Sequence, residues 1–145
     1  MYNSELDGYA FEDLKVGMHA TVSRTITETD LRNFSGVSGD TNPMHLNEEY
    51  GRTTPFHGTI VHGMLTASLI STVVGTKLPG PGCVYVSQTL KFLAPVRVGD
   101  TVYATGTIKE LKADRKRVVM HTECRVKDTV VIDGEAEIKV PSRND

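Results

Sequence analysis

The chain has 145 residues, with 16 Lys and Arg against 18 Asp and Glu, so its formal net charge at pH 7 is −2. This length predicts a single domain over residues 1–145. The balanced charge argues against nucleic-acid or membrane-surface binding, which usually needs a basic excess. The two cysteines, Cys83 and Cys124, are too few for a disulfide framework. Because the acidic N-terminal segment also lacks an apolar signal region, a reducing, cytoplasmic location is expected.

The first half of the chain is predicted to contain short elements followed by one longer helix. In chain order these are an arm (1–17), a strand (18–27), a short helix (29–34) and a small helical turn (47–50). Residues 60–75 then predict a helix of three to four turns that carries almost no charge. Such a helix is expected to be buried on nearly every side.

From Gly82 onward the apolar residues recur with a period of two, which indicates strands. The opposite faces are polar, which favours an antiparallel sheet with one wet side. The fold class expected is therefore α+β, a curved antiparallel sheet wrapped around a central helix. The apolar faces of the successive strands are Val84, Val86, Leu90 and Phe92; Val102, Ala104 and Ile108; Val118, Met120, Cys124 and Val126; and Val130, Ile132, Ala136, Ile138 and Val140.

The segment 38–45 carries a carboxylate and an imidazole five residues apart. Gly39 and Pro43 interrupt helical periodicity, so Asp40 and His45 are expected to lie side by side across a short turn. Two such groups around one small volume can give and take protons. The alternative is that Asp40 and Asn42 only build an Asx turn, which is common loop chemistry.

Small residues follow one face of the 60–75 helix at steps of four, namely Gly63, Ala67, Ser71 and Gly75. A face of this kind lets another backbone or a thin ligand approach the helix closely. Gly63 lies near the expected N-terminus, where free N–H groups can bind a polarised carbonyl oxygen. The alternative is that the small face serves close packing of the helix on the sheet.

Other motifs are weaker. His57 and His62 are five residues apart and do not share a helix face, so no metal site is predicted. The chain has no glycine-rich phosphate loop and no nucleophile elbow. The basic segment 112–117 could meet a phosphate group, but a solvated hairpin loop is the simpler interpretation.

Taken together, these residues resemble the MaoC-like (R)-specific enoyl-CoA hydratases, which have the hot dog fold. The resemblance runs from Phe11 to Val140. Its specific parts are the Asp-x4-His pattern within 38–45, the Ile-Val-His-Gly-Met segment at 60–64 and the Val-Gly-Asp segment at 98–100. It implies a single hot dog domain that reversibly hydrates trans-2-enoyl-CoA, or enoyl-acyl carrier protein, to the (R)-3-hydroxyacyl thioester in fatty-acid metabolism.

The resemblance also implies roles for particular residues. Asp40 and His45 would be the catalytic pair, and the Gly63 N–H would bind the thioester oxygen. No cofactor and no metal would be needed, and the enzyme would be a homodimer with its sites at the subunit interface. Further residues implied for oxyanion or substrate binding are Ser71, Asn42 and His62.

Two other classes of protein compete with a hydratase. A hot dog thioesterase would also bind acyl-CoA, but many of these carry an acid on the central helix, and residues 62–76 contain no Asp or Glu. A non-catalytic acyl-CoA-binding module would not need both Asp40 and His45. The sequence leaves open the acyl chain length, the physiological direction and the choice between CoA and acyl carrier protein.

Overall fold

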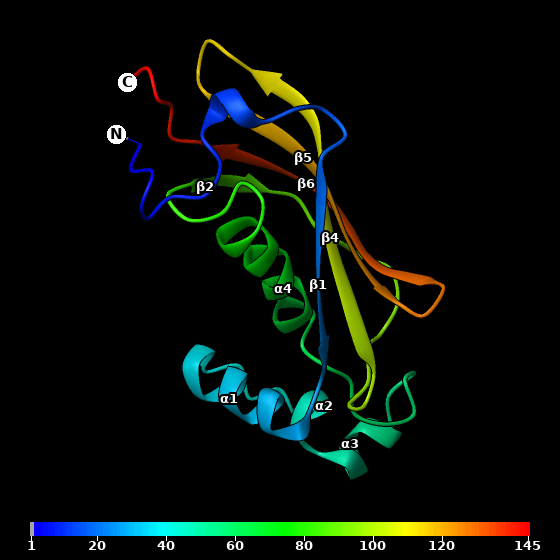
Figure 1. Ribbon diagram of the computed structural model, residues 1–145. Helices are drawn as coiled ribbons and strands as arrows, with labels where there is room; N and C mark the ends of the chain where they lie inside the picture. The colour runs from blue at the N-terminus through cyan, green and yellow to red at the C-terminus, as the bar shows by residue number, and fades with distance from the viewer. Residues whose placement is uncertain (1) are drawn as a thin grey trace.

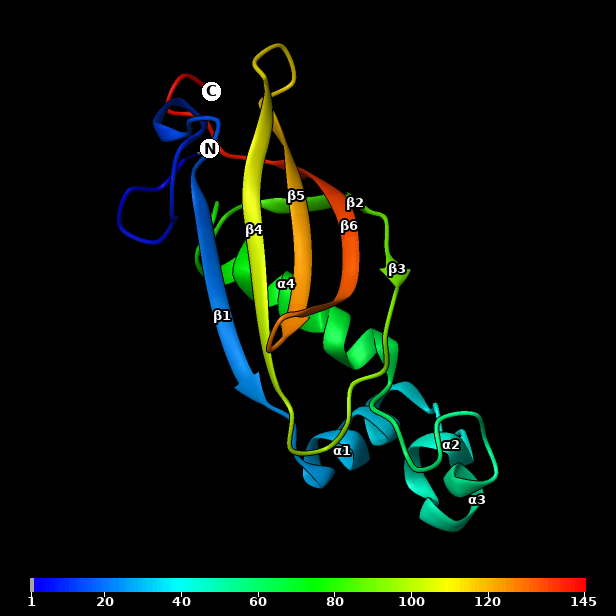
Figure 2. The same cartoon turned by 90° about the vertical axis from the view of Figure 1, so that its right-hand side faces the viewer.

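The computed structural model describes residues 2–145 as an antiparallel sheet curved around one long helix (Figures 1 and 2). This agrees with the α+β class and the wrapped sheet expected from the sequence. The elements in chain order are η1 (Phe11–Asp13), β1 (His19–Thr25), α1 (Glu28–Ser38), α2 (Pro43–Leu46), α3 (Glu48–Arg52), α4 (Gly63–Thr76), β2 (Val84–Gln88), β3 (Lys91–Phe92), β4 (Thr101–Lys112), β5 (Arg117–Val126) and β6 (Thr129–Lys139).

The sheet has the strand order β1-β4-β5-β6-β2, and β3 pairs with β6 beside this path. Every pairing is antiparallel. The period-two pattern of the last three strands places most of its apolar residues inward, as predicted, with Val102, Met120 and Ile138 fully buried. Val130 is an exception, because it is only half-buried and the neighbouring Val131 is buried instead. A register shift between Ile108 and Glu110 adds a bulge to β4, which helps the sheet curve.

Helix α4 packs its apolar side into the concave face of the sheet. Its buried residues include Leu69, Ile70, Val73 and Val74. The expectation that this helix is buried on nearly every side is wrong for a single chain, because the sheet covers only one side of it. The residues of α4 that remain exposed are Met64, Ser68, Ser71, Thr72, Gly75 and Thr76.

The predicted inward face of the first strand after α4 also needs correction. Val84, Val86 and Phe92 are exposed, and only Leu90 packs against the core. The cause is position: among the described strands, β2 and the short β3 each pair with β6 alone and lie along one edge of the sheet. The apolar residues of these two strands therefore lie at an edge that this chain does not cover.

The short helices α1, α2 and α3 form a separate layer at one end of the sheet, beside the start of α4 (Figure 1). Helix α1 begins earlier than predicted, because Thr27 and Asp30 form a capping box around its first turn. It ends at Gly39, whose φ of 77° is readily adopted by glycine. The predicted turn at 40–45 contains a helix that the sequence analysis missed, α2, which begins at Pro43.

The N-terminal arm and the C-terminal segment lie against each other at the opposite end of the sheet (Figure 1). The Phe11 N–H donates to the Pro141 carbonyl oxygen at 2.8 Å. The Asp13 carboxylate receives both terminal nitrogens of Arg143, at 2.7 and 2.8 Å. These contacts hold the N-terminal arm and the C-terminal segment together at this end of the sheet.

Both cysteines are free, with Cys124 buried and Cys83 half-buried at the start of β2. Within residues 2–145, no helix combines the length and the apolar character needed to cross a membrane. The cytoplasmic location expected from the sequence stays a prediction.

Candidate active site

Local backbone chemistry positions Asp40 and the residues after it. Asp40 directly follows the left-handed Gly39, and its Oδ1 accepts the Asn42 N–H at 3.2 Å. Asn42 in turn caps α2 by accepting the Met44 N–H at 3.1 Å. Asp40 and Asn42 therefore do form the Asx turns of the alternative interpretation, and these turns are compatible with a catalytic role for Asp40. The turn holds Asp40 exposed and turns the chain so that α2 carries His45 back toward it.

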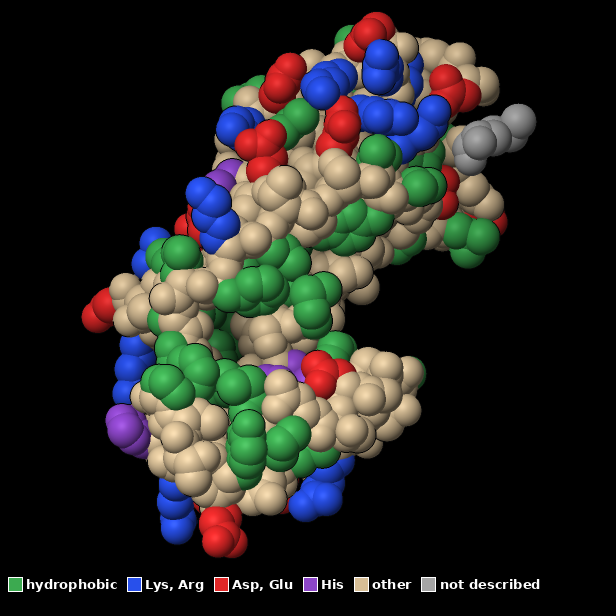
Figure 3. Space-filling view, turned by 180° about the vertical axis from the view of Figure 1, so that it is seen from behind, with side chains coloured by type: hydrophobic (Ala, Val, Ile, Leu, Met, Phe, Trp, Pro, Cys, Tyr) green, Lys and Arg blue, Asp and Glu red, His purple; other side chains and the backbone are tan. Residues whose placement is uncertain are grey.

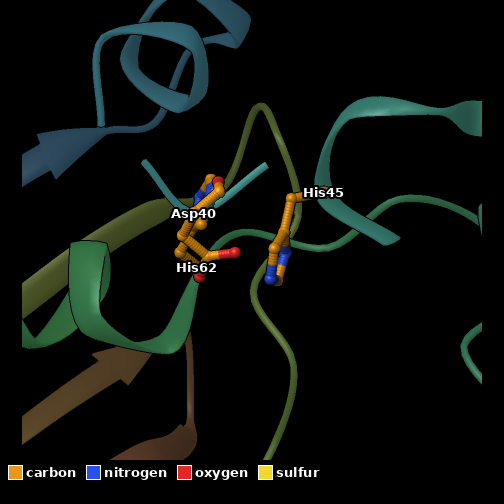
Figure 4. A group of neighbouring side chains, drawn as sticks. All are labelled: Asp40, His45 and His62. Atoms are coloured by element: carbon orange, nitrogen blue, oxygen red, sulfur yellow. The ribbon is translucent and has the colours of Figure 1, made fainter. Parts of the chain in front are cut away.

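Three ionisable side chains meet where this loop approaches the start of α4 (Figure 4). One side-chain oxygen of Asp40 and one ring nitrogen each of His45 and His62 lie within 4.8 Å of one another. Asp40 is exposed, whereas His45 is 9% and His62 1% exposed. The structure therefore brings together the two residues predicted as an acid–base pair and adds a second histidine to them.

The hydrogen bonding of His45 fixes which of its nitrogens is available. Its Nδ1 lies 2.8 Å from the main-chain carbonyl oxygen of Ile60. Because a carbonyl oxygen only accepts, Nδ1 carries the hydrogen, and Nε2 of the neutral ring keeps its lone pair. His45 is therefore set up to accept a proton at Nε2.

His62 is the N-cap residue of α4, and its ring contacts both Asp40 and His45. Its Nε2 is 3.1 Å from both the Ser35 Oγ and the Asp40 main-chain carbonyl oxygen. The ring stacks on that of His45, with centroids 4.0 Å apart and planes 27° from parallel. The Phe34 ring packs on it at 4.9 Å. Burial, followed by the nearby His45, lowers the pKa of His62, although the hydrogen bond to the Asp40 carbonyl opposes this shift.

A pocket of about 470 Å³ is lined by Asp40 and His62 of this group, whereas His45 lies outside its lining. Figure 3 shows the hollow from behind, with hydrophobic side chains around it and histidine and acidic atoms at its margin. Within residues 2–145, the Gly63 N–H has no hydrogen-bond partner, so the first turn of α4 presents a free donor beside the pocket. The lining is mostly apolar and consists of Asp40, Phe56, Ile60, Val61, His62, Gly63, Met64, Thr66, Phe92, Leu93, Ala94, Pro95, Val96 and Ile132.

The remaining predicted site residues lie in different places. Gly63 lines the pocket, and a Cβ built on it would come within 2.6 and 2.7 Å of two Phe92 ring carbons. Asn42 is exposed and uses its side chain to cap α2. Ser71 is exposed on α4, two turns beyond Gly63, and is not among the residues that line this pocket. The functional roles of all of these residues stay predictions.

A family comparison decides the classification of the chain. Residues 13–130 match the model of the MaoC-like domain. The chain belongs to the MaoC-like dehydratase family. The family predicted from the motifs at 38–45, 60–64 and 98–100 is thereby confirmed.

Individual relatives of this MaoC-like chain are similar over most of their length. An (R)-specific enoyl-CoA hydratase of Rhodospirillum rubrum is 54% identical over 92% of each chain. A 3-hydroxybutyryl-CoA dehydratase of Methylorubrum extorquens is 48% identical over 97% of this chain and 90% of that protein. The solved structure of an unliganded R-hydratase from Pseudomonas aeruginosa has a TM-score of 0.89 at 41% identity, covering 95% of this chain and 89% of that one. The predicted hot dog fold is confirmed by this match.

The donor set of the MaoC-like chain does not favour a metal ion, although a carboxylate and two imidazoles are suitable ligand types. A metal shared by two histidines lies close to the plane of both rings. The His45 and His62 rings are stacked face to face 4.0 Å apart, so one ion would lie out of the plane of at least one ring. The geometry of Asp40, His45 and His62 thus gives no support for a metal site.

Several residues around this candidate site were not predicted from the sequence. Phe56 comes from a loop, where no periodicity marks its direction, and Phe92 was assigned to the inward face of a strand rather than to a pocket. Ser35 reaches His62 from α1, 27 residues away. Thr66 lines the pocket, and its buried Oγ1 has no hydrogen-bond partner within residues 2–145. The sequence could have predicted Thr66 as a pocket residue, because Thr66 lies four residues after His62 and therefore on the same side of the helix.

Proposed function

We propose that this protein is a hydro-lyase that reversibly hydrates trans-2-enoyl-CoA, or enoyl-acyl carrier protein, to the (R)-3-hydroxyacyl thioester in fatty-acid metabolism. The observation that carries the proposal is the convergence of Asp40 and His45 beside an apolar pocket that also meets the free Gly63 N–H. The relatives support the same reaction, because they include an (R)-specific enoyl-CoA hydratase and a 3-hydroxybutyryl-CoA dehydratase. The site would lie in one domain of residues 1–145, and we place the reaction in the cytoplasm.

The arrangement supplies what this reaction requires. Hydration adds the water oxygen to C3 and a proton to C2, while negative charge gathers on the thioester oxygen. His45 Nε2 and the Asp40 carboxylate would hold the water, and its proton would pass through this pair to C2. We treat the two groups as one titrating unit. The Gly63 N–H would bind the thioester oxygen, and a preorganised donor of this kind lowers a barrier by about 3–4 kcal/mol. No step requires a cofactor.

One assay separates this function from the two rivals. Hydration removes the conjugated enoyl-thioester absorbance without releasing thiol, whereas a thioesterase would release free CoA, and a binding module would do neither. We expect loss of the absorbance with 2-enoyl-CoA substrates and an (R)-3-hydroxyacyl product on chiral analysis. A series of acyl chain lengths and a matching acyl carrier protein substrate would fix the specificity. Release of CoA as the main product would contradict the proposal.

We also propose that the protein is an obligate homodimer. The exposed side of α4 and the edge strand β2 leave apolar residues uncovered, including Met64, Val84 and Val86. Apolar surface of this kind usually marks an interface. Sedimentation is expected to give twice the 15.9 kDa mass of the chain. Val86→Asp should weaken the dimer, whereas Val37→Asp, on exposed α1, should not. A stable, active monomer of the unchanged protein would refute the proposal.

A further inference from the structure

His62 is the point at which three separate segments of the site meet. Its Nε2 reaches Ser35 on α1 and the main-chain carbonyl of Asp40, both at 3.1 Å. Its ring face carries the ring of His45, which belongs to α2. His62 itself caps α4, next to Gly63. A single side chain thus touches both predicted catalytic residues and is fixed to the central helix.

The hydrogen bonds of His62 also define its chemical form. The Asp40 carbonyl can only accept, so Nε2 carries the hydrogen, and the Ser35 hydroxyl oxygen shares it. Nδ1 is buried and has no hydrogen-bond partner within the described chain. A proton on Nδ1 would create a buried charged group directly against His45, and burial lowers the pKa of His62, although the Asp40 carbonyl and carboxylate oppose this shift. Burial therefore favours the neutral ring, with its hydrogen on Nε2.

We propose that His62 is a positioning residue that holds Asp40 and His45 in the orientation needed for catalysis. Its Nε2–H contacts Asp40, and its ring face contacts His45. This inference rests on the proposed hydratase function. The Nε2–H fixes the backbone of Asp40, and the stacked ring fixes the plane in which the His45 Nε2 lone pair points. A neutral His62 presents an aromatic face, and not a second cation, to the charge that His45 acquires on taking a proton.

His62 acts through its neighbours and does not itself share the reacting water. Hydrogen bonds to an imidazole nitrogen lie near the plane of the ring. Because the His45 and His62 rings are stacked, a water in the plane of the His45 ring lies outside the plane of the His62 ring. Its Nε2–H is already occupied by Asp40 and Ser35. Loss of His62 should therefore lower kcat by misplacing the pair, while substrate binding in the apolar pocket is largely retained.

Two substitutions test the two contacts separately. His62→Gln keeps an amide donor for the Asp40 carbonyl but removes the stacking ring, whereas His62→Phe keeps a flat ring but removes the donor. Each is expected to lower kcat by about 10- to 100-fold, since a misplacement of about 1 Å has effects of this size. KM should change by less than about threefold, as for a group that acts after binding. His121→Gln, a surface histidine paired with Asp133 on β6, is the matched control and should leave both constants unchanged.

A second measurement does not depend on activity. Amide hydrogen exchange should show faster exchange of the Asn42 and Met44 N–H groups in His62→Phe than in His62→Gln, because only the glutamine can still hold the loop. Full kcat in both folded variants, or equal exchange in the two, would overturn the positioning role. Absence of hydratase activity in the unchanged protein would instead refute the proposed function, and the exchange result would still decide whether His62 orders the loop.

Discussion

Replacement of Asp40 by Asn, or of His45 by Gln, is expected to lower the rate of 2-enoyl-CoA hydration by at least about two orders of magnitude. This is the usual scale for a positioned acid–base group. The two side chains meet at one point beside the pocket, and the His45 Nε2 lone pair is left free by the bond from Nδ1 to Ile60. The double variant should lose little more than either single variant, because groups that act as a unit are not additive.

The two substitutions differ in how much of the local structure they preserve. Asn at position 40 keeps an oxygen that can accept the Asn42 N–H, so the turn should survive. Gln at position 45 loses the ring that stacks on His62, so its melting temperature must be measured alongside kcat/KM. Asp114→Asn, in the exposed β4–β5 hairpin, is a control for the change of charge. Near-normal turnover in either folded single variant would remove the pair from the mechanism.

Gly63→Val should reduce activity steeply, by about 10²-fold or more, since a displacement of about 1 Å at the reacting group has this effect. The variant keeps the main-chain N–H but adds a branched side chain beside it. A Cβ at this position would meet the Phe92 ring at 2.6 Å, so either the ring or the start of α4 must move. Overpacking of this kind lowers stability by about 1–3 kcal/mol. Activity and melting temperature are therefore both expected to fall.

A compensating substitution separates the two effects. Gly63→Ala introduces the smallest side chain that meets Phe92, and Phe92→Leu should remove the ring atoms that it meets. If Gly63 serves only close packing, the double variant Gly63→Ala/Phe92→Leu should match Phe92→Leu alone in both stability and kcat/KM. If Gly63 also presents its N–H to the thioester oxygen, the double variant should match Phe92→Leu in stability but have a lower kcat/KM. A Gly63→Val variant that melts early but keeps full specific activity would place the oxyanion site elsewhere.

The sequence predicted those parts of the fold that have a regular repeat. Val118, Met120 and Cys124 recur with a period of two, and all three are buried in β5. The same pattern at Val84 and Val86 gave the wrong burial, because alternation does not tell an edge strand from a central one. The start of α1 was misplaced because Thr27, Thr29 and Asp30 all resemble cap residues in the sequence.

The site was predictable where its residues are close in the sequence. Asp40 and His45 share one turn, so their proximity follows from Gly39 and Pro43. The contacts of His62 with Ser35 and with the Asp40 carbonyl join residues 27 and 22 positions apart. No local pattern encodes such a pairing, because it depends on how the α1 layer packs against the start of α4. The Phe92 ring reaches Gly63 for a similar tertiary reason.

The pairing of the two chain ends has a practical consequence for engineering. The arm and the C-terminal segment are joined by Asp13 and Arg143 at one end of the sheet, whereas the α1–α3 layer, whose helix α2 carries His45, lies at the other end (Figure 1). An affinity tag, a fused partner protein or a surface linker attached at either end would leave the pocket mouth open. Immobilisation through residue 145 would orient the candidate site away from the support.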